Sequence, residues 1–403
     1  MGVIKVNIQK IFETVDSIKQ EIIDLRRDFH IHPEVGSEVE RTAGIVANLL
    51  TKWGLEVQTG VGITGVVGIL KGENSKSSNT VALRADMDAL LIQEENETCY
   101  KSVCDGKMHA CGHDGHTAML LGAAKALSKH KDMINGNIKF IFQPEEEGPN
   151  SGAENMVADG AMEDVNAIFG LHLTTEYPTG TVIIKKGAAM ASSDNFEIEM
   201  IGKGGHASMP HECIDAISMA VKVYTDIQFM VSREFNPLDS VIVSVGALNS
   251  GSASNVIQGS AKLKGTIRTL SHEVRAKVKK RIIEIAKHVA EEAGGECKVN
   301  IIPGVPPLIN DVKKASFAEE TVEKVVTREN VILLDKPNMG SEDFAYYVEK
   351  VPGVMMMIGA RNEEKGFVNL MHHPKFDFDE DALSIGTKLH IQLAIDYLES
   401  INA

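Results

Sequence analysis

A thiol and an imidazole stand two positions apart in the segment Met108–Asp114, at Cys111 and His113. Both residue types are common zinc ligands, and both side chains can reach one ion where the backbone turns or is extended. Gly112 between them leaves such a turn unhindered because it carries no side chain. The pair alone is weak support for a metal site, so its meaning depends on what the rest of the chain brings to it.

Groups that could complete a metal site follow later in the chain. The acidic run Glu145–Glu147 comes directly after the apolar segment Ile138–Phe142, which is typical of a strand. His172 ends another such segment, and His372 and His373 lie near the end of the sequence, where spacing alone does not choose between them. Open α/β sheets place their sites at the carboxyl ends of strands, so we expect these groups at one edge.

The acidic run also has a simpler interpretation as a solvated turn. Three adjacent carboxylates repel one another, so their clustering is costly unless cations or protons offset the charge. A metal-dependent hydrolase needs ligands that leave a position open for water, and a carboxylate that takes the proton of that water. Neighbouring glutamates can divide these two roles if their side chains diverge. A cysteine ligand favours zinc, nickel, cobalt or manganese over magnesium.

The other histidines are weaker candidates. His30, His32, His109 and His116 are more simply explained by packing or by local hydrogen bonds. His206 lies on the glycine-rich bend that begins at residue 202. It is either a turn residue or a residue carried to the substrate by domain closure or by a partner subunit.

The elements that must position these residues alternate between helix and strand in the first part of the chain. Because the strand segments are short and apolar, they predict a mostly parallel sheet covered by helices, which is an α/β fold. Segments typical of strands are Gly65–Leu70, Thr80–Leu83, Ile138–Phe142, Ala167–Leu171 and Thr181–Ile184. Segments with helical spacing are Ile11–Phe29, Thr42–Trp53 and Gly115–Leu127, the last with Asp114 as its cap.

The pattern changes after residue 186. Strand and helix signals then follow in the order βαββαβ, which is the plan of a ferredoxin-like α+β domain. The predicted elements are Asn195–Ile201, Asp215–Val231, Val241–Ala247, Ala261–Thr269, Glu273–Ala293 and Cys297–Ile302. We therefore expect one domain formed by residues 1–186 and 305–403, with a second domain inserted into it at residues 187–304.

Composition excludes several classes of protein. The 403 residues carry 41 Lys and Arg against 56 Asp and Glu, and the resulting charge of −15 argues against nucleic acid or an anionic membrane as a partner. No apolar run approaches the roughly 18 residues that span a bilayer. The first six residues do not resemble a signal peptide, and the five cysteines show no disulfide framework. We therefore expect a cytoplasmic protein.

Taken together, the motifs resemble those of the zinc-type aminoacylase/carboxypeptidase superfamily of metal-dependent amidohydrolases. The similarity is strongest to the branch of hippurate hydrolases, indole-acetyl-amino acid hydrolases and N-acyl-L-amino acid amidohydrolases, and it runs nearly end to end. The matching segments are His32–Glu34, Arg84–Leu90, Met108–His113, Gln143–Gly148, Gly170–His172, Gly204–Ala207, Ser254–Ile257, Gly340–Phe344 and His372 before Pro374. Several motifs in the same order make the resemblance specific.

The resemblance implies two divalent metal ions per subunit, of zinc, manganese, cobalt or nickel. It implies that Cys111 bridges the two ions as a thiolate. The other ligands that it implies are His113, Glu147, His172 and His372. His372 is favoured over its neighbour because the family's histidine stands two places before the proline.

The resemblance also implies that residues 1–186 and 305–403 form the catalytic domain and that residues 187–304 form a lid and dimerisation domain. It further implies roles for residues other than the ligands. Glu146 matches the general base that activates water, and Asp88 matches an acid that orients the site from behind the ligands. His206 matches a lid histidine that reaches the active site of a neighbouring subunit in a homodimer or dimer-based tetramer. Asn255 and Arg268 match lid positions that hold the substrate carboxylate. Glu145, Leu91 and Gln258 depart from the family pattern, which usually has a small residue at the first position and proline at the other two.

The function implied is hydrolysis of the amide of an N-acyl-L-amino acid, a small-molecule substrate. Two alternatives stay open at this point. A dipeptidase or aminopeptidase of the same superfamily would need a site for a free substrate amine, and no sequence element is dedicated to one. A metal-binding regulatory protein without turnover would have no use for Glu146 and His206.

Overall fold

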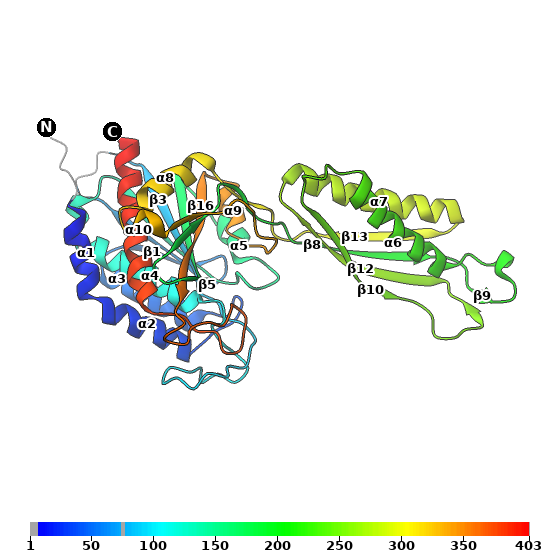
Figure 1. Cartoon of the computed structure of the whole chain (residues 1–403), viewed down its shortest axis with the longest axis horizontal. Helices are drawn as coiled ribbons and strands as arrows, with labels where there is room; N and C mark the ends of the chain where they lie inside the picture. The colour runs from blue at the N-terminus through cyan, green and yellow to red at the C-terminus, as the bar shows by residue number, and fades with distance from the viewer. Residues whose placement is uncertain (1–6, 74–76, 403) are drawn as a thin grey trace. The chain divides into compact units, whose positions relative to one another are not determined.

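The computed structural model describes residues 7–73 and 77–402, which form two compact units (Figure 1). Unit 1 contains Met1–Gly187, Asn310–Lys336 and Asp343–Ala403, and unit 2 contains Ala188–Ile309 and Pro337–Glu342. The amino-terminal residues 1–6 and residues 74–76 lie outside the described part, so the expectation that no signal peptide is present is not addressed. The domain boundaries expected at residues 186 and 304 stay a prediction.

Within the described residues, unit 1 is built on an eight-stranded sheet whose centre, β4-β3-β5-β16, is parallel. β1, β2 and β6 run antiparallel to a neighbour. In sheet order the strands are β1 Glu56–Val61, β2 Gly65–Lys71, β4 Asn137–Gln143, β3 Thr80–Asp86, β5 Ala167–Pro178, β16 Gly353–Arg361, β6 Val182–Ile184 and β15 Val331–Leu333. The predicted α/β class and mostly parallel sheet are therefore confirmed.

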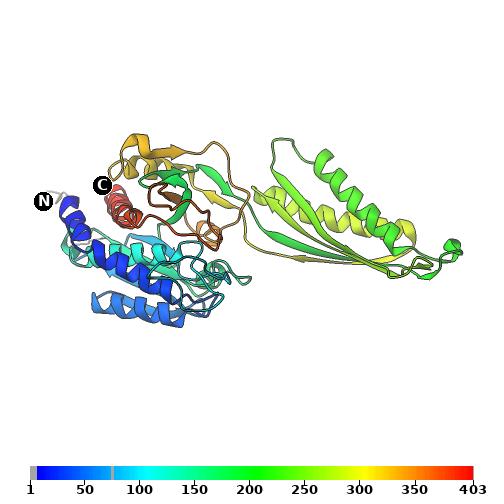
Figure 2. The same cartoon turned by 60° about the horizontal axis from the view of Figure 1, so that its bottom comes forward.

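Helices cover both faces of this sheet (Figure 2). Side chains alternate along a strand, so neighbouring residues of β5 show which helix lies on which face. The ring centroid of Phe169 lies 6.0 Å from that of Phe317, in the helix Val312–Val322, and 5.8 Å from that of Tyr397, in the helix Asp381–Asn402. A Cβ on Gly170 would instead meet Phe344, just before the helix Ala345–Val348, on the other face. The helices of unit 1 are α1 Ile8–Ser17, α2 Lys19–Ile31, α3 Glu40–Lys52, α4 His113–Ser128, α5 Gly152–Ala158, α8 Val312–Val322, α9 Ala345–Val348 and α10 Asp381–Asn402.

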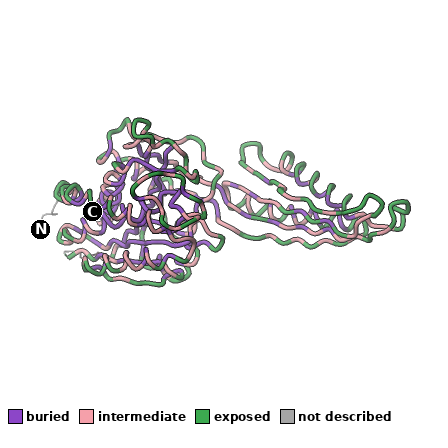
Figure 3. The backbone as a smooth tube through the Cα atoms, turned by 90° about the horizontal axis from the view of Figure 1, so that it is seen from below, coloured by how far each residue is buried: buried purple, intermediate pink, exposed green. Residues whose placement is uncertain are grey.

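Burial follows this layering. Every residue of β3 and nearly every residue of α4 is buried, so the core of unit 1 runs from the middle of the sheet into the helix that follows Cys111 (Figure 3). Burying so much apolar surface is the main stabilising contribution to such a unit. The segment that contains the candidate ligands is thus anchored in a rigid core.

Unit 2 is a four-stranded antiparallel sheet in the order β10-β12-β8-β13, with α6 and α7 packed on one face. The predicted βαββαβ order is present, with one additional ribbon made by β9 and β11. The elements of unit 2 are β8 Asp194–Ile201, β9 Gly205–His206, α6 Ala216–Arg233, β10 Val241–Asn249, β11 Val256–Ile257, β12 Ser260–Thr269, α7 His272–Ala293 and β13 Glu296–Ile302. Two further short strands, β7 Gly187–Met190 and β14 Leu308–Asn310, pair with each other.

Two local predictions were wrong. The helix expected over Ile11–Phe29 is interrupted at Ile18, although the apolar spacing continues across the break. Asp114 does not cap α4, because Gly112, with a left-handed φ of 88°, holds that position and Asp114 lies inside the first turn. Among the residues that the structure describes, no helix is long and apolar enough to cross a membrane.

Candidate metal centre

The candidate ligands gather where the central strands end. Asp88 comes two residues after β3, Glu146 and Glu147 come just after β4, and His172 lies near the middle of β5. His113 is the first residue of α4, which packs on β3 and β5. Parallel neighbours end at the same edge of a sheet, so residues far apart in the sequence meet there.

The potential ligand atoms form overlapping groups, each with all atoms within 4.8 Å of one another. One group is Cys111, His113 and His172, and a second is Cys111, Glu147 and His372. Cys111 belongs to both, and its Sγ lies 3.5 Å from Nε2 of His172. The five predicted ligands are thus brought together as two sets that share one thiol.

The choice between the two adjacent histidines is supported by the same geometry. Nε2 of His372 lies 2.9 Å from Oε1 of Glu147, and the backbone N–H of His372 donates to the carbonyl of Ala110. His372 adopts a left-handed φ of 66°, which is uncommon for a residue with a side chain. His373 instead accepts the backbone N–H of Lys375 at Nδ1 and belongs to none of the ligand groups formed by the described residues.

Several of these atoms are buried without a hydrogen bond of good geometry among the described residues. They include both ring nitrogens of His113, although Nδ1 lies 3.3 Å from Asp88 and Nε2 lies 3.7 Å from Asp86. Oε1 of Glu147 is likewise buried without a hydrogen bond of good geometry, although it lies 2.9 Å from Nε2 of His372. Buried polar atoms without partners are rare in folded proteins. Atoms that converge without bonding one another fit a site for cations.

The electrostatics of the cluster agree with that fit. Burial, followed by the charges of Glu147 and Glu146, raises the pKa of the Cys111 thiol. Burial alone would lower the pKa of His113, but Asp86 and Asp88 raise it to about 10. The protein alone therefore draws a proton into this cluster, and the same field favours a divalent cation that displaces it.

Glu146 lies beside the ligands, and Asp88 holds its backbone. Glu146 shares a third group of potential ligand atoms with His113 and Glu147. The two oxygens of Asp88 accept the backbone N–H groups of Glu146 and Glu147, each at 3.0 Å. Asp88 thus fixes the turn that carries the predicted base and one predicted ligand.

Glu145, the first of the three glutamates, has a different role in the turn. Its backbone N–H donates to the carbonyl of Gly36, and its own carbonyl accepts the N–H of Gly152. Its Oε1 accepts the amide of Asn150 at 2.9 Å, and its φ of 52° is left-handed. These contacts close the turn, whereas Oε2 of Glu145 is buried without a hydrogen bond among the described residues.

Asp86 and His116 were not singled out as functional by the sequence. They form a further group of potential ligand atoms with His113. However, His116 Nδ1 lies 2.6 Å from Asp86, and its Nε2 accepts the backbone N–H of Leu173 at 2.8 Å. Burial lowers the pKa of His116 to about 4, so the ring is neutral. With both ring nitrogens bonded to protein, His116 supports the site and is not a ligand, although its partners lie 30 and 57 residues away in the sequence and are not local ones.

The three predicted residues of unit 2 lie in two different places, two at the ribbon of β9 and β11 and one on β12. His206 is exposed on β9, opposite Val256 of β11, and Asn255 accepts the N–H of Ala207 at its carbonyl. Arg268 lies near the other end of β12, where it donates to Thr266. Eight strand residues at about 3.4 Å each put Arg268 about 27 Å from Ser260, the end of β12 nearest the ribbon. Unit 2 therefore does not bring Arg268 to His206 and Asn255.

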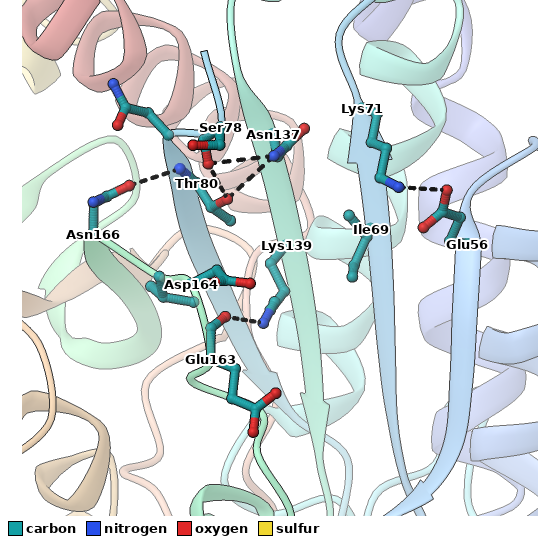
Figure 4. Close-up of a pocket in the computed structure, with 12 residues that line it drawn as sticks. Glu56, Ile69, Lys71, Ser78, Thr80, Asn137, Lys139, Glu163, Asp164 and Asn166 are labelled. Atoms are coloured by element: carbon teal, nitrogen blue, oxygen red, sulfur yellow. Dashed lines mark hydrogen bonds and ion pairs between the residues drawn. The ribbon is translucent and has the colours of Figure 1, made fainter.

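A pocket at the opposite edge of the sheet, where β3 and β4 begin, offers different chemistry (Figure 4). Nζ of Lys139 donates to the carbonyls of Ala161 and Glu163, and Lys71 pairs with Glu56 at 2.8 Å. The residues described around this pocket include none of the predicted ligands. Its lysines already bond to protein groups, so the pocket competes poorly with the metal centre as a reaction site.

Comparison with known proteins agrees with this geometry. The sequence pattern of Peptidase family M20/M25/M40 matches residues 82–396. The chain is 40% identical over 392 residues to Thermostable carboxypeptidase 2 of Saccharolobus solfataricus, covering 97% of this chain and 98% of the relative. It is 39% identical over 386 residues to IAA-amino acid hydrolase ILR1-like 4 of Arabidopsis thaliana, covering 95% and 87%.

A solved structure extends the likeness to the fold. The Bacillus subtilis YXEP protein, described as a dinuclear metal binding peptidase from the M20 family, superposes with a TM-score of 0.82 at 32% identity. The alignment covers 96% of this chain and 99% of that protein. The predicted resemblance and the expectation of an enzyme are confirmed, and two divalent cations are supported without their identity. The chain therefore belongs to Peptidase family M20/M25/M40 and is a metal-dependent amide hydrolase.

Proposed function

We propose that the enzyme hydrolyses the amide bond of N-acyl-L-amino acids. The observation that carries this proposal is the pair of ligand sets that share Cys111, with the carboxylate of Glu146 beside them. Relatives named for IAA-amino acid hydrolysis and for N-acetylcysteine deacetylation support the substrate class. Both names describe an amide between an acyl group and an amino acid.

The residues of the chain divide the work of hydrolysis. When bound, two divalent cations would polarise the scissile carbonyl and make water more acidic. Cys111, His113, Glu147, His172 and His372 would hold them. Glu146 accepts the proton of the attacking water and returns it to the departing nitrogen, which is general base and then general acid catalysis. Asp88 keeps Glu146 in place through its backbone.

We further propose that the enzyme works as a homodimer or a dimer-based tetramer. Because Arg268 lies at the end of β12 far from the ribbon of β9 and β11 that carries His206, one small substrate that uses both needs them from different subunits. Ile217, Val221 and Tyr224 form an exposed apolar stripe on α6, and β10 is an edge strand, so both surfaces are available for pairing. The mass in solution, measured by light scattering, tests this proposal. A monomer that retains full activity would contradict it.

The free state of all five cysteines supports the proposed cytoplasmic location.

A second candidate function is cleavage of peptides, because a relative at 40% identity is named a carboxypeptidase. The dipeptidase and aminopeptidase alternatives additionally require a site for a free amine. A regulatory protein without turnover leaves the placement of Glu146 unexplained.

A substrate screen separates these functions. The enzyme, reconstituted in turn with zinc, manganese, cobalt and nickel, is offered N-acetyl-, N-benzoyl- and indole-acetyl-amino acids beside dipeptides and N-blocked peptides. We expect turnover of the N-acyl-amino acids to exceed that of the unblocked dipeptides. Preference for free dipeptides would favour the peptidase alternative, and no turnover with any metal would favour the regulatory one.

A further inference from the structure

A hydrogen-bonded chain of buried groups lies directly behind His172. His116 of α4 contacts Asp86 through Nδ1 and the backbone N–H of Leu173 through Nε2. Nδ1 of His172 in turn lies 2.7 Å from the carbonyl oxygen of Leu173. Asp86 and His116 are each no more than 1% exposed. Neither residue has a role among the ligands, the base or the substrate contacts proposed above.

The direction of each hydrogen bond follows from the donors. A backbone N–H can only donate, so Nε2 of His116 must accept from Leu173 and carries no proton. The proton of the neutral ring is therefore on Nδ1 and is donated to Asp86. For His172 the carbonyl of Leu173 can only accept, so Nδ1 of His172 donates and Nε2 presents its lone pair on the side of Cys111.

The backbone of β5 explains why His116 is needed. β3 pairs with β5 in the register from Val81–Ala167 to Arg84–Gly170 and goes no further. β5 continues to Pro178, so beyond Gly170 its N–H groups on that side lack a strand partner. A buried N–H without an acceptor is costly, and His116 supplies the acceptor at Leu173. The same bond holds the N–H of Leu173, and the carbonyl of that residue, in the next peptide group, accepts from Nδ1 of His172.

Asp86 is itself held firmly. Arg84 Nη1 donates to Asp86 at 2.6 Å, and Arg84 Nη2 donates to Asp343 at 3.0 Å. Gln143 donates to Asp343 and accepts from Nε of Arg84. All four side chains are buried, so the ring of His116 has one well-defined orientation.

We propose that His116 is a positioning residue for the metal centre, which holds the backbone of Leu173 so that Nε2 of His172 points toward the position that Cys111 and His113 offer to a metal ion. This inference rests on the proposed ligand role of His172. His116 would act through His172, so we expect its loss to change the metal affinity and not the rate of the chemical step alone. Outer partners of metal ligands contribute about 10- to 100-fold in affinity or activity.

Two amide variants separate the two bonds of the ring. The amide of Gln reaches the position of Nε2 and can accept from Leu173, whereas the amide of Asn reaches the position of Nδ1 and contacts only Asp86. We expect His116→Asn to weaken one of two cobalt(II) equivalents by about 10- to 100-fold, as outer partners typically do. His116→Gln should stay close to wild type. The matched control is His390→Asn, which removes another buried histidine of unit 1.

Cobalt(II) binding to the apo enzyme, followed by its absorption bands and by equilibrium dialysis, gives the readout without any substrate. Thermal unfolding of the same apo proteins reports their folding. Equal cobalt affinity in His116→Asn and His116→Gln would overturn the inference, as would an equal loss in His390→Asn. His172→Ala is measured in parallel. If it too leaves both equivalents unchanged, the proposed ligand set fails, which is a different outcome from failure of His116 alone.

Discussion

Unit 1 buries two groups of acids and histidines, and they differ in what balances the charge. In the Arg26 network, Nε of Arg26 donates to Asp114 at 2.8 Å and Nη2 donates to Asp377 at 2.7 Å. Nδ1 of His30 lies 2.7 Å from the same oxygen of Asp114. The guanidinium is fully buried and supplies the cation that these acids need.

The metal centre has no such residue among its described ligands. The carboxylate of Glu147 and the thiol of Cys111 lie beside His113, whose two ring nitrogens are buried without a hydrogen bond of good geometry among the described residues. Uncompensated buried charge is costly, so an arrangement of this kind needs a cation from outside the chain. The comparison teaches that a buried cluster of acid and histidine indicates a metal site only where no arginine or lysine closes it.

The largest expected effect is on the reaction itself. Glu146→Gln removes the base but keeps the size of the side chain, so turnover should fall by about 10²- to 10⁴-fold while both metal equivalents remain. Steady-state kinetics and elemental analysis on the same preparation check this. Glu145→Gln is the matched control, because that side chain closes the turn, and it should retain turnover near that of wild type. Near-normal activity of Glu146→Gln would remove the assigned base.

The next effect concerns the Arg26 network, in which the guanidinium of Arg26 balances the buried acids. Arg26→Met should lower the free energy of unfolding by about 3–5 kcal/mol, because it leaves Asp114 and Asp377 buried without their cation. Metal stoichiometry of the folded fraction should not change. Arg27→Met is the control, since Arg27 is partly exposed beside Glu380 and such pairs contribute about 0–1 kcal/mol. Urea denaturation measures both, and equal destabilisation by the two variants would show that the buried network is not special.

For the metal centre we expect the opposite result, in which the amount of bound metal changes. Cys111→Ser replaces the thiol that both ligand sets share, so we expect one of the two metal equivalents to be lost on dialysis. Cys213→Ser, in unit 2, should keep both. Elemental analysis gives the stoichiometry directly. Two equivalents in Cys111→Ser would contradict the bridging role and would leave the two ligand sets independent.

Much of the candidate site was predictable because its residues follow strand ends and stand in recognisable motifs. The supports were not predictable in the same way. The role of His116 depends on β3 ending at Asp86 while β5 continues, which is a property of the sheet and not of any local spacing. Asp114 was assigned to a helix cap because an acid at that position usually caps. Its bond to Arg26, 88 residues earlier in the sequence, left no local signal.

The fold shows the same limit. The strand and helix order of unit 2 was predicted, as were β2, β3, β4, β5 and β6 of unit 1, since apolar periodicity reports burial directly. The strands β1 and β16 of unit 1 were not predicted. The break at Ile18 was missed because residues on both sides of it keep the same buried face. The β9 and β11 ribbon was missed because two-residue strands have no periodicity.

The smallest effect extends the comparison to unit 2, where Asp194 is buried beside Arg275 and Lys279 at 2.7 Å each. Burial alone would raise the pKa of Asp194, but Arg275 and Lys279 lower it overall. The unfolded chain then binds more protons than the folded one below about pH 4, so this stability is present above that pH and is lost as pH falls further.

Asp194→Asn should therefore be less stable than wild type at neutral pH, and the difference in the free energy of unfolding should narrow in acid. Urea denaturation across this range measures the gap, and Asp226→Asn, at an exposed pair with Lys222, should differ from wild type by well under about 1 kcal/mol. A difference in the free energy of unfolding that stays constant with pH would mean that Asp194 stabilises unit 2 through its size and hydrogen bonding and not through its charge.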